Sequence, residues 1–253
     1  MTSSAMGRII LARDMAASLT TFTLWRFPTT AERAWAFVEM GLARPRLMTQ
    51  RGLVFWKLVG AGAGAGFALR PDWSRYGLVA VWRDASAAEE FFARATLVAR
   101  YRAHSDEEWT VRLTATHAKG AWSGEQPFTP SENTARADGG PVAVITRATL
   151  RWRRLAAFWS AVPSTSAALE RAPGLCASVG IGEIPYLRQA TFSLWRDDAA
   201  LRDFAYRDPV HREVIRRTRD EGWYAEELFA RFRVVGSAGS WHGRDPLKAS
   251  VVQ

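Results

Sequence analysis

The chain has 253 residues, of which 48% are hydrophobic and 12% aromatic, and a net charge of +9. This composition excludes a disordered chain and allows a substantial core in one large or two small domains. The basic residues are nearly all arginine and are spread among Asp and Glu, so we expect a solvated surface and no nucleic-acid site. Cys176 is the only cysteine, which excludes an intrachain disulfide and a clustered cysteine metal site.

Residues 1–17 form an N-terminal extension with a short apolar core and internal charges. This pattern is typical of neither a secretory signal nor a membrane-spanning helix. The longest uncharged apolar run, residues 58–69, is short and rich in glycine, so it also predicts no spanning segment. We therefore expect a cytoplasmic protein, and contact of its basic face with an anionic membrane surface stays open.

The first half, residues 18–128, has the element order strand, helix, strand, strand, helix, strand. A β-branched and aromatic segment predicts a strand at 18–27, and an amphipathic pattern predicts a helix at 30–42. The remaining expected elements are strands at 53–59 and 76–82, a helix at 86–104 and a strand at 109–116.

Residues 129–140, TPSENTARADGG, are typical of a linker. The same order of elements then repeats over the second half, residues 141–247. Its expected strands are 142–150, 175–180, 189–195 and 227–235. Its expected helices are 154–169, interrupted near Pro163, and 199–219, broken at Asp208-Pro209. We expect the tail, residues 248–253, to fray.

The two halves also share sequence. The matches are Trp82-Arg83-Asp84 with Trp195-Arg196-Asp197, Phe91 with Phe204, Trp109 with Trp223, and Gly120-x-Trp122-x-Gly124 with Gly239-x-Trp241-x-Gly243. A duplicated βαββαβ order predicts an α+β fold of two tandem ferredoxin-like halves, each with its helices on one face of a four-stranded sheet. Packed sheet to sheet, the halves would form a pseudo-symmetric dimeric α/β-barrel.

His211 is specific to the second half, because its counterpart in the first half is Val98. Asp208 and Pro209 favour a helix that begins just before it, so the imidazole would lie in the first turn on the apolar face. Two interpretations stay open for such a histidine. It is either a core side chain bonded to a backbone carbonyl or an axial ligand of haem iron, whose usual proximal donor is neutral imidazole.

The alternating glycines from Gly60 to Gly66 suggest a phosphate loop, but that chemistry needs a helix directly after the glycines. Pro71 argues against such a helix. We therefore expect a loop between two strands that lets the backbone approach a bulky ligand. The sequence has neither paired histidines at zinc spacing nor a Gly-x-Ser-x-Gly nucleophile elbow.

Several segments, in order from about residue 21 to residue 246, resemble the spheroidene monooxygenase family. They are Phe55-Trp56-Lys57 with the glycine-rich run, Pro71-Asp72-Trp73, ITRATL, VGIGEIPYLRQATFSLW and EELFARFRVVGSAGSWHGRDP. The resemblance implies an acyclic carotenoid 2-ketolase of carotenoid biosynthesis. In that reaction, two hydroxylations at one carbon with O2 give a diol that loses water to a ketone. Members are regarded as dependent on haem b and fed by reduced ferredoxin, and the resemblance places the iron on His211.

Under this hypothesis, an apolar substrate and the haem share a pocket in the second half. We expect its walls to include Phe192, Trp195, Phe204 and Trp223, with Arg188 as a partner of a haem propionate or a distal group. Two alternatives stay open: a haem enzyme of another type, such as an aldoxime dehydratase, peroxidase or nitrogen-oxidising enzyme, and a ligand-binding protein without catalysis. A homo-oligomer also stays open.

Overall fold

The computed structural model describes residues 18–64, 66–130 and 139–249, so the predicted extension and most of the predicted linker lie outside it. The elements of the first half are β1 (Leu19–Arg26), α1 (Thr30–Leu42), α2 (Arg44–Met48), β2 (Leu53–Gly62), β3 (Pro71–Trp82), α3 (Ala85–Arg94), α4 (Thr96–His104) and β4 (Glu107–Gly120). Those of the second half are β5 (Val142–Leu150), the 3-10 turn η1 (Trp152–Arg154), α6 (Leu155–Glu170), β6 (Leu175–Ile184), β7 (Arg188–Trp195), α7 (Asp198–Arg207), α8 (Pro209–Glu221), β8 (Tyr224–Gly239) and α9 (Pro246–Ala249).

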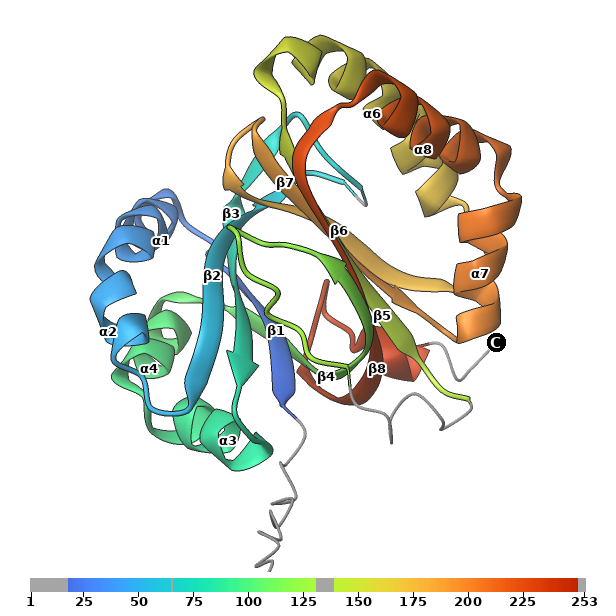
Figure 1. Cartoon of the computed structure of the whole chain (residues 1–253). Helices are drawn as coiled ribbons and strands as arrows, with labels where there is room; N and C mark the ends of the chain where they lie inside the picture. The colour runs from blue at the N-terminus through green and yellow to red at the C-terminus, as the bar shows by residue number, and fades with distance from the viewer. Residues whose placement is uncertain (1–17, 65, 131–138, 250–253) are drawn as a thin grey trace, which may run out of the picture.

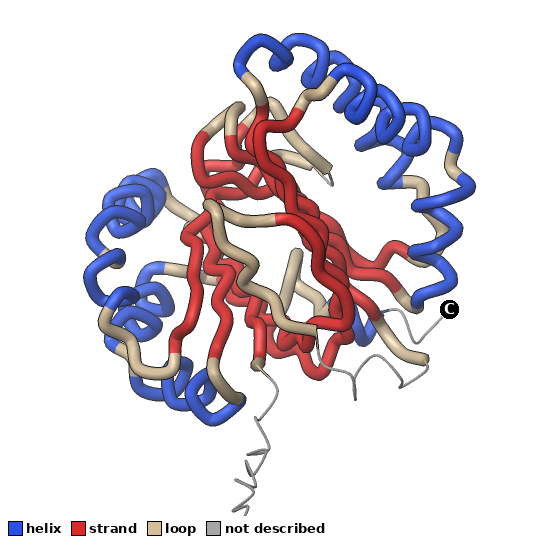
Figure 2. Tube along the Cα trace, viewed as in Figure 1, coloured by secondary structure: helices blue, strands red, loops and turns tan. Residues whose placement is uncertain are grey.

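The strands form one closed antiparallel barrel in the order β1-β3-β2-β6-β7-β5-β8-β4. Each half contributes four adjacent strands, and the halves join where β4 pairs with β8 and β2 pairs with β6. The strands lie at the centre of the molecule, with α1–α4 outside on one side and α6–α8 on the other (Figures 1 and 2). The predicted pseudo-symmetric dimeric α/β-barrel is confirmed.

The interior of the barrel is filled with aromatic and branched side chains. Phe22 of β1 stacks on Phe192 of β7 with ring centroids 4.0 Å apart, and Trp109 meets Phe192 edge-on at 5.9 Å. An eight-stranded barrel is just wide enough for its own side chains to fill. The described interior side chains therefore form a packed core.

Two predictions about the helices were wrong. The single helix expected over 86–104 is divided into α3 and α4 at Ala95, whose backbone is extended (φ −68°, ψ 127°). Asp208 divides α7 from α8 in nearly the same conformation, so the break belongs to the repeated fold and needs no proline. The expected interruption near Pro163 is absent, because α6 continues through it, and Thr165 donates a hydrogen bond to the Ala161 carbonyl there at 3.0 Å.

The match of Trp109 with Trp223 was also wrong. Gly120 and Gly239 end β4 and β8, and counting back from these glycines pairs Trp109 with Leu228 in the barrel interior. Trp223 instead lies before β8 begins.

The tail expected to fray begins as α9, and residues 250–253 lie outside the described ranges. No helix in those ranges combines the length and apolarity needed to span a bilayer.

Candidate functional site

The helices of the first half pack on their sheet through a continuous apolar core. Leu78 on the sheet and Val98 on α4 are each 1% exposed, and Thr23 of β1 is fully buried. Large aromatic side chains, including Trp82, Phe91 and Tyr101, complete this core. The described residues around Leu78 and Val98 therefore fill the space between α4 and its strands.

The second half carries smaller side chains at the same positions of its sheet. The Trp-Arg-Asp match and the strand pairing place Thr191 where the first half has Leu78, and Gly180 where it has Leu58. In the same way Ser178 takes the place of Trp56. At Ser178 and Thr191 the outer face of β6 and β7 therefore carries less side-chain volume than the first half, whereas at Gly180 the backbone of Gly66 takes the place of the Leu58 side chain.

The helix layer of the second half does not close over this face. Thr146, Ser178 and Thr191 lie on the helix side of the sheet but are only partly buried, and no described side chain of α8 is buried. Val210 is 36% exposed, whereas its counterpart Leu97 is 5% exposed. From this incomplete burial we infer a space, which we name the second-half cleft. Its floor is Thr146, Ser178 and Thr191, and the glycine-rich loop bounds it at Gly180, where the carbonyl oxygen of Gly66 lies against the strand. Its cover is the Val214 and Ile215 face of α8.

His211 is the third residue of α8, in the first helical turn as predicted. Its side chain lies outside the part of the chain that the structure describes. The matched residue Val98 is buried between α4 and the first-half sheet. Position 211 therefore corresponds to a backbone position that faces the sheet in the other half.

The predicted aromatic walls do not converge on one place. Trp195 and Phe204 pack together with centroids 5.2 Å apart near Val142, at one end of β5. Trp223 packs in a separate cluster with Leu150, at the other end of β5. These ends are about 27 Å apart at the rise of an antiparallel strand. Trp195 and Trp223 therefore cannot both contact one small group.

Phe192 and Arg188 lie on the other side of the sheet from the cleft. Phe192 is fully buried in the barrel interior. Arg188 begins β7 at a position of the same parity as Phe192, so it belongs to the interior-facing row at one end of the barrel. Thr191, the neighbour that reaches the cleft, was missed because a small polar residue gives no signal of its own. Comparing side-chain size between the matched halves would have found it.

The glycine-rich loop of the first half reaches the second half. A side chain at Gly180 would collide with the carbonyl oxygen of Gly66, and a Cβ at Gly66 would lie 2.5 Å from Ser166 Oγ of α6. Phe67 meets Phe158 of α6 edge-on at 5.2 Å. The described residues between β2 and β3 contain no helix, which confirms the predicted loop. The close approach that its glycines permit is to β6 and α6, and approach to a ligand stays a prediction.

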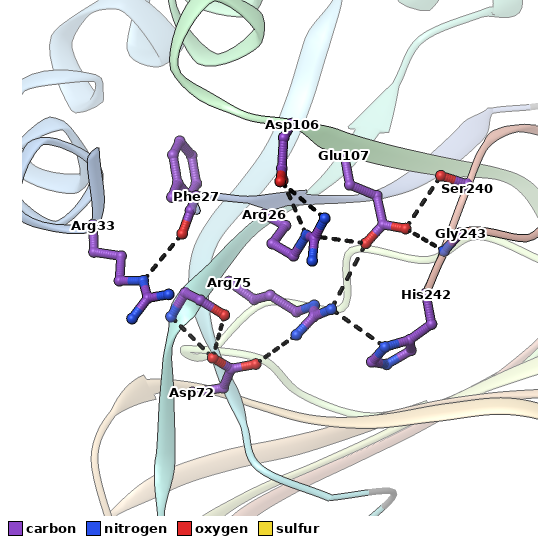
Figure 3. Close-up of polar contacts among 11 residues, drawn as sticks. Arg26, Phe27, Arg33, Asp72, Arg75, Asp106, Glu107, Ser240, His242 and Gly243 are labelled. Atoms are coloured by element: carbon purple, nitrogen blue, oxygen red, sulfur yellow. Dashed lines mark hydrogen bonds and ion pairs between the residues drawn. The ribbon is translucent and has the colours of Figure 1, made fainter. Parts of the chain in front are cut away.

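Each Gly-x-Trp-x-Gly turn is held by a glutamate of the other half. The Gly243 amide donates to Glu107 at 2.7 Å, and Arg75 links Glu107, Asp72 and His242 (Figure 3). Burial would raise the pKa of Glu107, but hydrogen bonds from Gly243 and Ser240 and the nearby guanidinium groups hold that pKa below its ordinary value. Burial and the Arg75 charge lower the pKa of His242.

The matching glutamate of the second half is Glu226. It accepts the Gly124 amide at 2.7 Å and pairs with Arg147, whose side chain is 1% exposed. Burial would raise the pKa of Glu226, but the Gly124 and Ser123 amides and Arg147 hold it below 4.5. Both glutamates therefore serve to fasten one half to the other.

We expect Glu226→Gln to lower the free energy of unfolding by about 2 kcal/mol at pH 7, because Arg147 loses a charged partner while Glu183 remains 3.6 Å away. The lowered pKa means that the carboxylate contributes fully above pH 4.5 and that its contribution falls as the pH drops through the folded-state value. Urea unfolding at pH 7 and at pH 3.5 measures this, with the exposed Glu90→Gln as control. An equal loss at both pH values would contradict the assignment.

No model of a known protein family matches the chain. It is 38% identical over 231 residues to spheroidene monooxygenase of Rhodobacter capsulatus, covering 91% of this chain and 96% of that protein. It is 34% identical over 228 residues to spheroidene monooxygenase of Cereibacter sphaeroides, covering 90% and 70%. Among solved structures, an aldoxime dehydratase in complex with butyraldoxime superposes with a TM-score of 0.59 and 13% identity, covering 88% of this chain and 81% of that one. This last likeness concerns the fold alone.

Proposed function

We propose, from the premise that the chain belongs to the spheroidene monooxygenase family, that it ketolates an acyclic carotenoid and uses haem b in the second-half cleft. Membership of that family makes the chain a monooxygenase, an oxidoreductase that takes O2 and a small-molecule substrate. The name of the relatives supplies the substrate class, spheroidene-type carotenoids. A place in carotenoid biosynthesis follows from that class.

The observation that carries the haem proposal is the difference between the two helix layers. Where Leu78 fills the first half, Thr191 leaves the second half partly open. A flat macrocycle needs a slot of this kind, with a neutral imidazole at one face. In this proposal His211, in the first turn of α8, would supply that imidazole. A partly buried sheet face beneath a helix that carries a histidine is compatible with the group.

Each part of the cleft has a separate task in this proposal. His211 would hold the iron, and bound haem would supply the activation of O2 that C–H oxidation requires. Phe158 and Trp223, which are buried and pack with Val214 of α8, close one end of the cleft and exclude water. Thr146 and Thr191 offer hydroxyl groups on the floor of the cleft, which can hold a proton or orient a polar atom.

The electron donor in this proposal is reduced ferredoxin, an acidic protein. The chain has a net charge of +9. On α8, Arg216 and Arg217 pair with acidic residues of the same helix, whereas Arg212 and Arg219 are exposed. These two exposed arginines and the positive net charge would attract an acidic donor. Contact with an anionic membrane surface, where carotenoids reside, would use the same type of charge.

Reconstitution tests the proposal directly. The protein is expressed with a haem precursor, purified and incubated with spheroidene, O2 and reduced ferredoxin. We expect a haem absorption band and a product in which one CH2 group has become C=O, identified by mass spectrometry. A colourless protein that ignores added haemin would contradict the haem assignment. A haem protein that leaves spheroidene unchanged but dehydrates an aldoxime would contradict the reaction.

A further inference from the structure

An apolar cavity lies on the outside of the barrel, at the seam where the halves join through β2 and β6. Its volume is 510 Å³. Its wall consists of α1 and the start of α2, β2, the loop into β3 and the first residues of β3, the end of β6, the β6–β7 turn and the start of β7. We name it the seam pocket. Ligand sites are typically concave, mostly apolar and of this size, and they often lie between domains. The second-half cleft uses none of the residues that line it.

Large apolar side chains of the seam pocket stand in solvent. Phe37 is 60% exposed and Trp73 is 54% exposed, and their rings meet edge-on with centroids 6.1 Å apart. Leu69 and Tyr186 of the pocket wall are also exposed. Apolar side chains that gather around a cavity mark a binding site, whereas scattered ones are ordinary.

The acidic side chains in the wall already have partners within the protein. Asp72 accepts hydrogen bonds from Ser74 and Arg75, both at 2.9 Å. Glu183 accepts one from Trp122 Nε1 at 2.7 Å. A ligand that covers these two carboxylates leaves them hydrogen-bonded, so a hydrocarbon can lie over them without that cost. The wall therefore suits an apolar chain better than a polar metabolite.

The seam pocket and the second-half cleft lie along one face of β7. Gln189 in the pocket wall and Thr191 on the floor of the cleft are alternate residues of this strand, so they face the same side. The glycine-rich loop crosses between the two spaces. Ala68 lines the pocket, and Gly66 packs against Gly180 at the edge of the cleft. The pocket and the cleft are therefore neighbours along β7, with one loop between them.

We infer that the seam pocket binds the long polyene chain of the substrate whose reacting end lies in the second-half cleft. The inference rests on the proposed function, since it takes its occupant from there. A carotenoid is a long, rigid hydrocarbon, and a slot that holds its oxidised end leaves most of its length outside. Phe37 and Trp73 at the rim cover that length with aromatic surface.

Binding of spheroidene without turnover tests the inference. The full-length His211→Ala variant, which we expect to be free of haem, is titrated with spheroidene in detergent micelles. Binding is followed by the shift of the polyene absorption and by quenching of tryptophan fluorescence. Two further changes are then added singly. Phe37→Asp removes an apolar wall, and Gly41→Phe fills the pocket, because a Cβ at Gly41 meets no atom within 4 Å.

We expect each change to raise the Kd for spheroidene about tenfold or more, the effect of removing one buried aromatic contact or of blocking the space. Tyr206→Asp, an exposed aromatic on α7, is the matched control and should alter the Kd by less than about twofold. Equal Kd values for Phe37→Asp, Gly41→Phe and the parent overturn the inference. So does a dimer in light scattering that Phe37→Asp splits into monomers, because a second copy would then cover the rim.

The inference and the proposed function can fail separately. If the variants change the Kd for spheroidene as expected but the wild-type protein takes up no haem, the seam-pocket inference is supported and the haem proposal is contradicted. If the wild type binds haem and oxidises spheroidene but the variants have the Kd of their parent, the haem proposal is supported and the seam-pocket inference is contradicted.

Discussion

The His211→Ala variant is expected to fold and to retain no haem. Alanine is the best helix former, so α8 should persist, while the proposed iron ligand is removed. The first half offers no matched histidine to replace it, since the counterpart at position 98 is valine. After incubation with haemin and gel filtration, the ratio of haem to protein absorbance should fall from near stoichiometric in the wild type to background.

His117→Ala is the control for this variant, because His117 is exposed on β4 of the first half. It should bind haem as the wild type does. Added imidazole should restore part of the haem spectrum to His211→Ala, since it can enter the space left by the side chain. Retention of full haem with an unchanged spectrum in His211→Ala would show that the ligand lies elsewhere.

Val98→His tests whether a histidine at the matched position of the first half is enough to bind haem. Val98 is 1% exposed in a filled core, so an imidazole there meets Leu78 and its neighbours instead of an open space. We expect no second haem site and a loss of stability of about 1–3 kcal/mol, the usual effect of a larger side chain in a packed core. Haem titration and thermal unfolding measure both effects. A second equivalent of bound haem would mean that an imidazole at this place suffices without the cleft.

Local pattern was enough to predict the βαββαβ order, because strand alternation and helix periodicity are read over a few residues. The contacts between the halves could not be predicted in this way. The glycine-rich loop reaches Ser166, a hundred residues away in the sequence, and nothing near Gly66 indicates that partner. The break at Ala95 was likewise invisible, since alanine favours a helix and tertiary structure overrides that preference.

The positions of the site candidates depend on which face of a strand each residue occupies. Phe192 and Thr191 are adjacent in the sequence but point to opposite faces of β7, so the aromatic candidate lies in the barrel interior and its small neighbour on the helix side. A pocket forms where small side chains leave space, whereas large aromatic side chains usually lie in packed cores. In a duplicated chain, the side-chain volume at a position of one half can be compared with the volume at the matched position of the other half. A smaller residue in one half then indicates where space can remain.

Restoring the first-half side chains to the second-half cleft should abolish haem binding while keeping the fold. In the Ser178→Trp, Thr191→Leu double variant, the outer face of β6 and β7 carries the residues that fill the first half at Trp56 and Leu78. Thr191→Val is the matched control, because it removes the hydroxyl but adds no volume. We expect haem uptake to be undetectable in the double variant and close to that of the wild type in Thr191→Val.

The thermal stability of the double variant distinguishes a filled cleft from a misfolded protein, since both would fail to bind haem. The added side chains bury apolar surface against α6 and α8, and a fully buried leucine contributes about 1.5–3 kcal/mol. Thermal unfolding of the double variant without haem should therefore occur at or above the temperature of the haem-free wild type. Undiminished haem uptake by a folded double variant would mean that the macrocycle does not lie on this face. The barrel interior is closed by the Phe22–Phe192 stack, so the asymmetry of the two helix layers would then need another explanation.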